Sequence, residues 1–135
     1  SKSDKEFSLL HVQNAMLSLG SVQAAKVAMA ARALADDRRA YALHRAMLAH
    51  RGQIDGMGAL GHAKKLGFDA KALEDKADSD EIRKQLTLHT QTGRALAMDA
   101  TPSFAMNGAG VGGWPGPKAV ARMVKNVRAC ERISC

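Results

Sequence analysis

Two cysteines are the first candidates for chemistry in this sequence, because a thiolate can act as a nucleophile, a metal ligand or one half of a disulfide. Cys130 and Cys135 lie at the C-terminal end with four residues between them. This spacing matches neither a Cys-x-x-Cys redox pair nor half of a zinc site. On one continuous helix the two residues would be about 7.5 Å apart along the axis, so a disulfide requires the helix to end between them. We expect a possible disulfide or free thiols here, and not a catalyst.

Five histidines are the next candidates, since neutral imidazole is a common metal ligand. His44 and His50 are six residues apart, which places them on different faces of a helix. His11, His62 and His89 fall on separate predicted elements, and no His-x-x-x-His pair occurs. The sequence therefore predicts no metal site and no cofactor, and we expect the histidines on the surface or in the core.

Other catalytic and nucleotide-binding patterns do not occur in the sequence. The glycine-rich stretch Gly108–Gly113 follows a predicted hairpin turn and lacks Gly-Lys-Ser/Thr, which argues against a phosphate-binding loop. No Ser-His-Asp set or carboxylate pair has a local spacing that indicates catalysis. The residues by themselves predict no catalytic group.

A proline, a strand pattern and a turn follow one another between residues 100 and 108. Phe104 and Met106 alternate with small residues, which is the period of a half-buried strand. Asn107-Gly108 then supplies a strong hairpin signal, because both residues tolerate positive φ. The Thr101-Pro102 bond opens this strand and can be cis, although base rates alone favour trans.

Composition and charge limit the class of protein to which this chain can belong. A chain of 135 residues with 46% hydrophobic and 24% charged residues is typical of one soluble globular domain. Few aromatic residues and many alanines favour close-packed helices. No run is long enough to span a membrane, and no signal segment is visible, although a removed signal would leave no trace. The net charge of +7 permits a nucleic acid or an acidic partner, but its spread over all predicted helices favours a solvated surface.

Hydrophobic periodicity and capping residues predict five helices before a pair of strands and one helix after it. Gly20-Ser21 reads as a break followed by an N-cap, so the first helix is expected to begin at Ser21. The helices are expected over about 21–34, 38–51, 55–67, 69–73, 80–96 and 117–127, and the strands over 103–106 and 109–112.

A helix-turn-helix DNA reader is one alternative, because the helix from Arg38 to Arg51 and the next one, with Lys64-Lys65, have suitable lengths. A recognition helix usually exposes Asn, Gln, Arg or Ser to the bases. The second helix offers Asp55, Gly58 and Gly61 instead. Nucleic acid is therefore the less favoured partner.

Four motifs follow one another in an informative order. They are Ser21-x-x-Ala24-Ala25-x-x-Ala28 with Ala31, Tyr41-x-x-His44-x-x-Met47-Leu48, Leu66-Gly67-Phe68-Asp69 and Thr101-Pro102-Ser103-Phe104. Together they resemble the DsbA-like thioredoxin family of thiol–disulfide oxidoreductases, from about Lys5-Glu6-Phe7 to the last helix. The resemblance implies an α+β, mostly helical, incomplete thioredoxin fold in a single domain over 1–135. A helical insertion would occupy 21–97, and the C-terminal hairpin and helix of the thioredoxin fold would occupy 98–135.

The resemblance also implies a function, with one departure. Thr101 and Pro102, joined by a cis bond, match the substrate-side residues that lie beside the family's redox cysteines and meet an extended polypeptide. The strand, Cys-x-x-Cys and helix expected before Lys5 do not occur in this sequence. Cys130 and Cys135 are no replacement at the end of the last helix, where the helix dipole disfavours a thiolate.

We therefore expect a truncated or degenerate domain of an exported or periplasmic type, not redox-active by itself, that holds a polypeptide or a partner protein. Two enzyme alternatives stay open. The domain could be an active oxidoreductase when the N-terminal part is present, or Cys130 and Cys135 could act as a redox pair.

The strand after Pro102 also predicts an assembly. In the family this strand would pair with the central strand that is missing here, which leaves an apolar edge open to association. Two strands alone are only marginally stable. We therefore expect a homodimer in which a second copy covers the edge.

Overall fold

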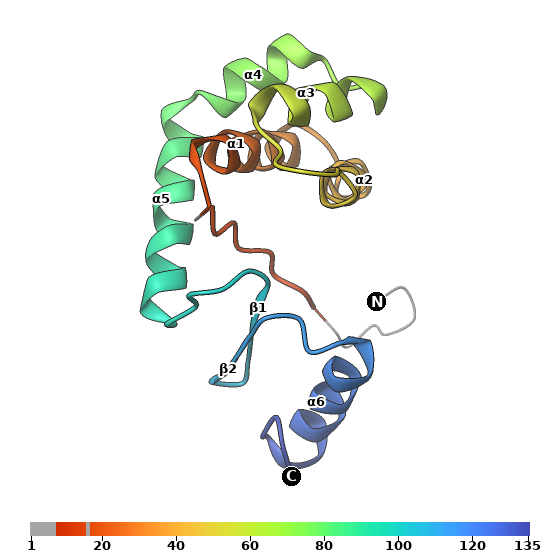
Figure 1. The fold of residues 1–135 in the computed structure, drawn as a ribbon, viewed down its shortest axis with the longest axis vertical. Coiled ribbons are helices and arrows are strands. Elements are labelled where there is room, and N and C mark those ends of the chain that lie inside the picture. The colour runs from red at the N-terminus through yellow and green to blue at the C-terminus, as the bar shows by residue number, and fades with distance from the viewer. Residues whose placement is uncertain (1–7, 16) are drawn as a thin grey trace. The chain divides into compact units, whose positions relative to one another are not determined.

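The computed structural model describes residues 8–15 and 17–135 (Figure 1). Lys5, Glu6 and Phe7, where the resemblance begins, lie outside the described residues. The predicted class, mostly helical with one antiparallel strand pair, is confirmed for the described part of the chain. Its elements are α1 (Leu19–Leu34), α2 (Asp37–Leu48), α3 (Gly56–Lys65), α4 (Ala70–Ala77), α5 (Asp80–Ala95), β1 (Ser103–Met106), β2 (Ala109–Gly112) and α6 (Pro117–Cys130).

The chain divides into two compact units, Ser1–Thr90 and Gln91–Cys135, with the boundary inside α5. The first unit holds α1 to α4 and most of α5, and the second holds the hairpin and α6. The predicted domain limits, a helical insertion over 21–97 and a thioredoxin half over 98–135, stay predictions.

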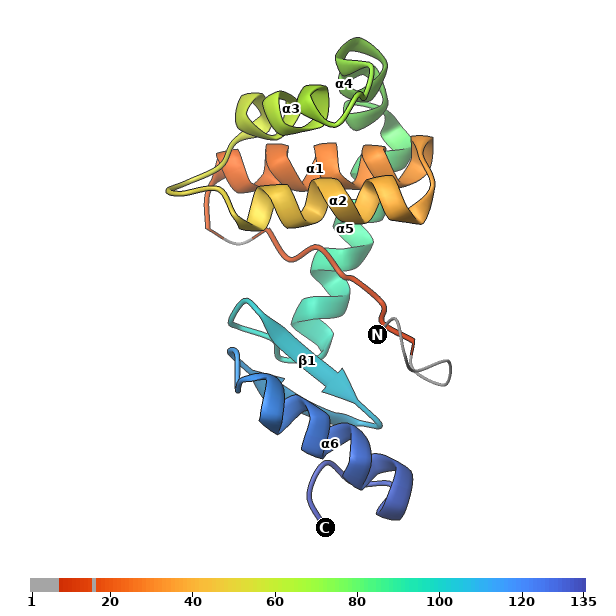
Figure 2. The same ribbon diagram turned by 90° about the vertical axis from the view of Figure 1, so that its right-hand side faces the viewer.

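Helix α1 is the centre of the first unit, and α2, α3 and α4 all pack against it (Figure 2). Its buried face consists mainly of alanines, which allow helices to approach closely. Gly20 and Gly56 show how close the approach is, because a Cβ built on them would lie 3.2 Å from Asp55 Cβ and 3.1 Å from Gln23 Cβ, respectively. The small residues of the sequence therefore act as packing surfaces.

The expected start of the first helix was wrong by two residues. Ser18, not Ser21, is the N-cap of α1, and the Ser18 hydroxyl accepts from the Ser21 N–H at 3.1 Å. The Ser21 hydroxyl in turn accepts from the Ser18 N–H at 3.0 Å, which completes a capping box. Ser21 therefore takes part in the cap, but from the third helical position.

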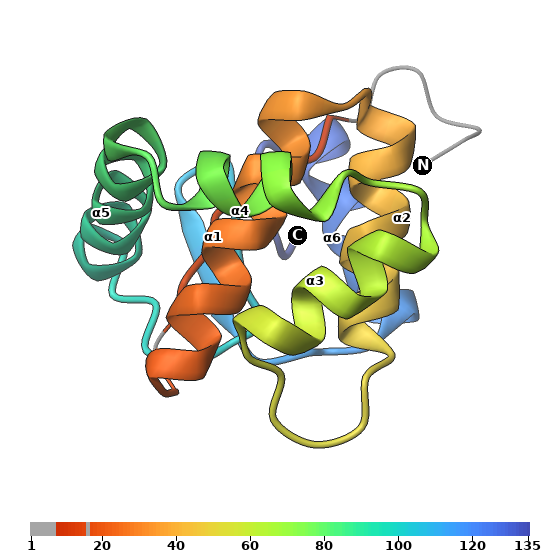
Figure 3. The same cartoon turned by 90° about the horizontal axis from the view of Figure 1, so that it is seen from above.

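Two apolar clusters form the core of the first unit. Leu43 of α2 and Leu73 of α4 are fully buried with the alanine face of α1. Ile82 and Leu86, from the first half of α5, pack with Ala25 and Met29 of α1. Figure 3 shows α4 crossing α1. No described helix is long and apolar enough to cross a membrane.

The hairpin of the second unit has the predicted limits and turn. β1 and β2 pair antiparallel from Ser103 opposite Gly112 to Met106 opposite Ala109. Asn107 and Gly108 have φ angles of 46° and 78°, as a two-residue hairpin turn of type I′ requires. No residue from Arg94 to Cys135 is buried, so this part of the chain contributes nothing to the core.

Candidate functional site

The Thr101–Pro102 peptide bond is cis, as the resemblance implied, and it directly precedes β1. Both residues are exposed. The Ser103 hydroxyl donates to the carbonyl oxygen of Ala100 at 2.5 Å and so closes the turn around the proline. The two predicted substrate-side residues thus sit on the surface at the entry of the strand.

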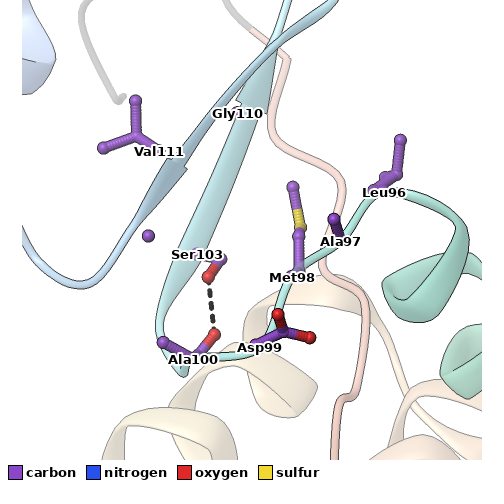
Figure 4. Close-up of a pocket in the computed structure, with 9 residues that line it drawn as sticks. Leu96, Ala97, Met98, Asp99, Ala100, Ser103, Gly110 and Val111 are labelled. Carbon is purple, nitrogen blue, oxygen red and sulfur yellow. Dashed lines mark hydrogen bonds between the residues drawn. The ribbon is translucent and has the colours of Figure 1, made fainter.

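A shallow hollow of about 330 Å³ lies beside this turn (Figure 4). One wall comes from the segment after α5, including Leu96 and Met98, and the other from Ser103 and the glycines of β2. A second hollow of about 230 Å³ runs on along the hairpin and shares Leu96, Met98 and Gly110. Apolar side chains and main-chain atoms together line the two hollows.

Strand β1 has a neighbour on one edge only within the described part of the chain. A two-residue turn makes Met106 and Ala109 a hydrogen-bonded pair, and the pairs then alternate along the ladder. Ser103 and Ala105 therefore direct their N–H and C=O groups toward the outer edge of β1, and Gly110 directs its groups toward the outer edge of β2. Each edge presents main-chain groups that an added strand can pair with.

Large apolar side chains are also accessible on the hairpin unit. Trp114 is 60% exposed, and its ring centroid lies 5.7 Å from that of Phe104. Phe104 and Met106 are half-buried. The hairpin unit thus combines main-chain N–H and C=O groups that face the outer strand edges with exposed apolar side chains.

The structure joins Cys130 and Cys135 as a disulfide, with their Cα atoms 6.4 Å apart. Helix α6 ends at Cys130, and Glu131 has a left-handed φ of 58°, so the helix does end between the two cysteines. Asn107 at the hairpin tip donates to the Glu131 carbonyl oxygen at 2.6 Å. The cysteine loop therefore adjoins the tip of the hairpin, whereas Pro102 lies at the opposite end of β1, about 17 Å from Asn107 for five residues of extended chain.

The histidines form pairs that local spacing could not reveal. The ring centroids of His11 and His44 are 4.8 Å apart, and His50 Nδ1 lies 3.1 Å from His62 Nε2. Burial, and secondarily the nearby His11, lowers the pKa of His44. Burial also lowers the pKa of His89, whose Nδ1 accepts from the Gln13 N–H at 3.2 Å. No group of three or more metal-binding side chains occurs among the described residues.

The helix-turn-helix alternative gains no support from the side chains that the structure places there. Arg39 of α2 is held against the end of α3, and Asp55 caps that helix through the Gly58 N–H at 2.8 Å. Arg39 and Asp55 thus make local structural contacts.

Comparisons with known proteins agree with this geometry. The family profile described as DSBA-like thioredoxin domain matches residues 5–128. A solved structure described as a thioredoxin-like oxidoreductase from Silicibacter pomeroyi DSS-3 is similar, with a TM-score of 0.80 and 25% sequence identity. The match covers 88% of this chain and 67% of that one. A comparison with curated proteins gives no match.

Proposed function

Because the chain belongs to the DSBA-like thioredoxin domain family, we propose that it supplies the polypeptide-binding side of a thiol–disulfide oxidoreductase fold and performs no disulfide exchange by itself. No Cys-x-x-Cys occurs within its 135 residues. Exchange needs an accessible thiolate beside the bound substrate, with a second thiol to resolve the mixed disulfide. The exported or periplasmic setting common to the family belongs to this proposal, since disulfides persist there.

The open edge of β1 is the observation that carries the proposal. It starts directly after Thr101 and Pro102, and the outward main-chain groups of Ser103 and Ala105 can pair with an extended polypeptide. The hollows beside it offer space for side chains of that polypeptide. Thr101 and Pro102 then line the bound chain rather than react with it.

The C-terminal disulfide supports a structural role and argues against the rival redox pair. Cys130 and Cys135 lie beyond the hairpin tip and line neither hollow. Cys130 occupies the carboxyl end of α6, where the helix dipole disfavours a thiolate. The part of a bound polypeptide that lies next to Pro102 would thus be at the other end of β1 from these sulfurs.

An insulin-reduction assay tests the catalytic half of the proposal. With dithiothreitol as reductant, we expect the chain to leave the rate of insulin precipitation at its uncatalysed value. The variant Cys130→Ser should behave identically. Turnover comparable to that of an intact family member would contradict the proposal, and its loss in Cys130→Ser would assign the activity to the C-terminal pair.

A second copy of the chain is the proposed partner when no polypeptide is bound. No residue from Arg94 to Cys135 is buried, and a two-stranded sheet gains stability from a further strand. Pairing of two β1 edges would supply that strand symmetrically. The homodimer and the polypeptide complex would therefore compete for one edge.

A further inference from the structure

Two imidazole nitrogens from different segments of the chain meet on the first unit. His50 follows the end of α2, and His62 lies on α3. His50 Nδ1 and His62 Nε2 are 3.1 Å apart, and the two ring planes are nearly perpendicular at 89°. The histidines are twelve residues apart in the sequence, with the turn between α2 and α3 separating them.

This separation suits two ligands on one metal ion. With metal–nitrogen bonds of about 2.05 Å, a nitrogen–nitrogen distance of 3.1 Å corresponds to an angle of about 98° at the metal. That value lies between the right angle of square-planar or octahedral coordination and the tetrahedral angle. Both rings are accessible to solvent, since His50 is exposed and His62 is half-buried.

We infer that His50 and His62 form a two-histidine site for a borderline divalent cation of the copper, nickel and zinc class, with water completing the coordination. Imidazole is a ligand that these ions share, and Cu²⁺ is bound most tightly in the series. Without the ion, one ring donates a hydrogen bond to the other. Binding displaces the proton held between the nitrogens.

The surrounding structure holds the backbone of both residues before binding. Asp55 caps α3 by accepting from the Gly58 N–H, which fixes the start of the helix that carries His62. The His50 N–H donates to the Met47 carbonyl oxygen at 3.1 Å, which holds His50 against the last turn of α2. A bound ion would therefore join α2 to α3 and stabilise the folded chain by mass action.

Calorimetric titration with CuCl₂ near neutral pH tests the site, using His50→Gln, His62→Gln and the double variant. We expect one ion per wild-type chain, an affinity at least about tenfold lower in either single variant, and no further loss in the double variant. His44→Gln is the matched control, because His44 belongs to the other histidine pair. It should keep the wild-type affinity.

Thermal unfolding gives a second measurement on the same proteins. Added Cu²⁺ should raise the Tm of the wild type and of His44→Gln, and leave the Tm of His62→Gln nearly unchanged. An unchanged affinity in His50→Gln or His62→Gln would overturn the assignment. A loss of Cu²⁺ affinity in His44→Gln as large as that in His62→Gln would overturn the assignment as well.

Discussion

Arg39 shows how one side chain joins two elements of the first unit. Its guanidinium carbon lies 4.5 Å from the centre of the Phe68 ring, and its Nη2 donates to the Gly67 carbonyl oxygen at 2.7 Å. The same nitrogen donates to the Leu66 carbonyl oxygen at 3.3 Å. These carbonyls follow the end of α3, where a helix leaves acceptors without intrahelical donors. Arg39 therefore fastens α2 to the end of α3.

Replacing Arg39 by Met should lower the free energy of unfolding by about 0.5–1 kcal/mol, because it removes an exposed cation–π contact and two hydrogen bonds. Urea unfolding measures the change. Arg38→Met is the matched control, an exposed neighbour on the same helix that should change stability by less than about 0.5 kcal/mol. Equal decreases in the free energy of unfolding of the two variants would show that Arg39 makes no specific stabilising contact.

His44 makes a pH-dependent contribution to stability. Burial first, and the nearby His11 second, lower its pKa in the folded chain. The unfolded chain therefore takes up the proton at higher pH than the folded chain does, and stability falls as the pH drops below the ordinary histidine pKa of about 6.5.

The variant His44→Gln should flatten this dependence in urea unfolding between pH 7.5 and 5, by the linkage just described. His11→Gln should flatten it less, because it removes only the second cause. A slope that is unchanged in His44→Gln would contradict the assignment.

At the scale of elements, signals that act over a few residues were readable from the sequence. Asp36, Asp55 and Asp69 each cap the helix that follows, and Asn107-Gly108 forms the hairpin turn. The start of α1 was misplaced because serines at both 18 and 21 can cap, and only their reciprocal hydrogen bonds show which one is the N-cap.

Contacts between elements could not be read from the sequence. The pairs His11–His44 and His50–His62 depend on how α2 packs relative to other segments, which residue spacing along one helix does not encode. The same holds for the hollows beside the hairpin, whose walls come from separate segments. The position of Thr101-Pro102 at the entry of β1 was readable, because proline and strand signals are adjacent.

Helix α2 offers a test of the core, because it carries both a buried and an exposed leucine. Leu43 is fully buried among the alanines of α1, whereas Leu48 is 73% exposed. Leu43→Ala should lower the free energy of unfolding by about 2–5 kcal/mol, and Leu48→Ala by less than about 0.5 kcal/mol. Urea unfolding with both variants checks this, and similar losses would contradict the described packing.

At the scale of the whole molecule, burial is distributed unequally along the chain. All residues of the two core clusters precede residue 90, and no residue from Arg94 to Cys135 is buried. A segment without buried side chains has little to stabilise it against local opening. The hairpin unit should therefore depend on partners more than the helical unit does.

Light scattering after size-exclusion chromatography should show a dimer whose fraction grows with protein concentration. Hydrogen exchange of the hairpin amides should slow as the dimer forms, while exchange in α1 stays constant, because only the hairpin gains a neighbour. A monomer at every concentration, with a hairpin as protected as α1, would contradict the proposed assembly.

Binding of an unfolded polypeptide to the edge of β1 is the most direct test of the central claim. The probe is the reduced, carboxymethylated B chain of insulin, and the signal is the fluorescence of Trp114, the single tryptophan. Ala105→Pro removes an N–H from the outer edge of β1, and the matched control Ala105→Ser keeps that N–H at the same exposed position. We predict that Ala105→Pro weakens binding by about tenfold and that Ala105→Ser keeps it within about threefold of wild type. Equal binding by Ala105→Pro and the wild type would contradict the claim that this edge holds the polypeptide.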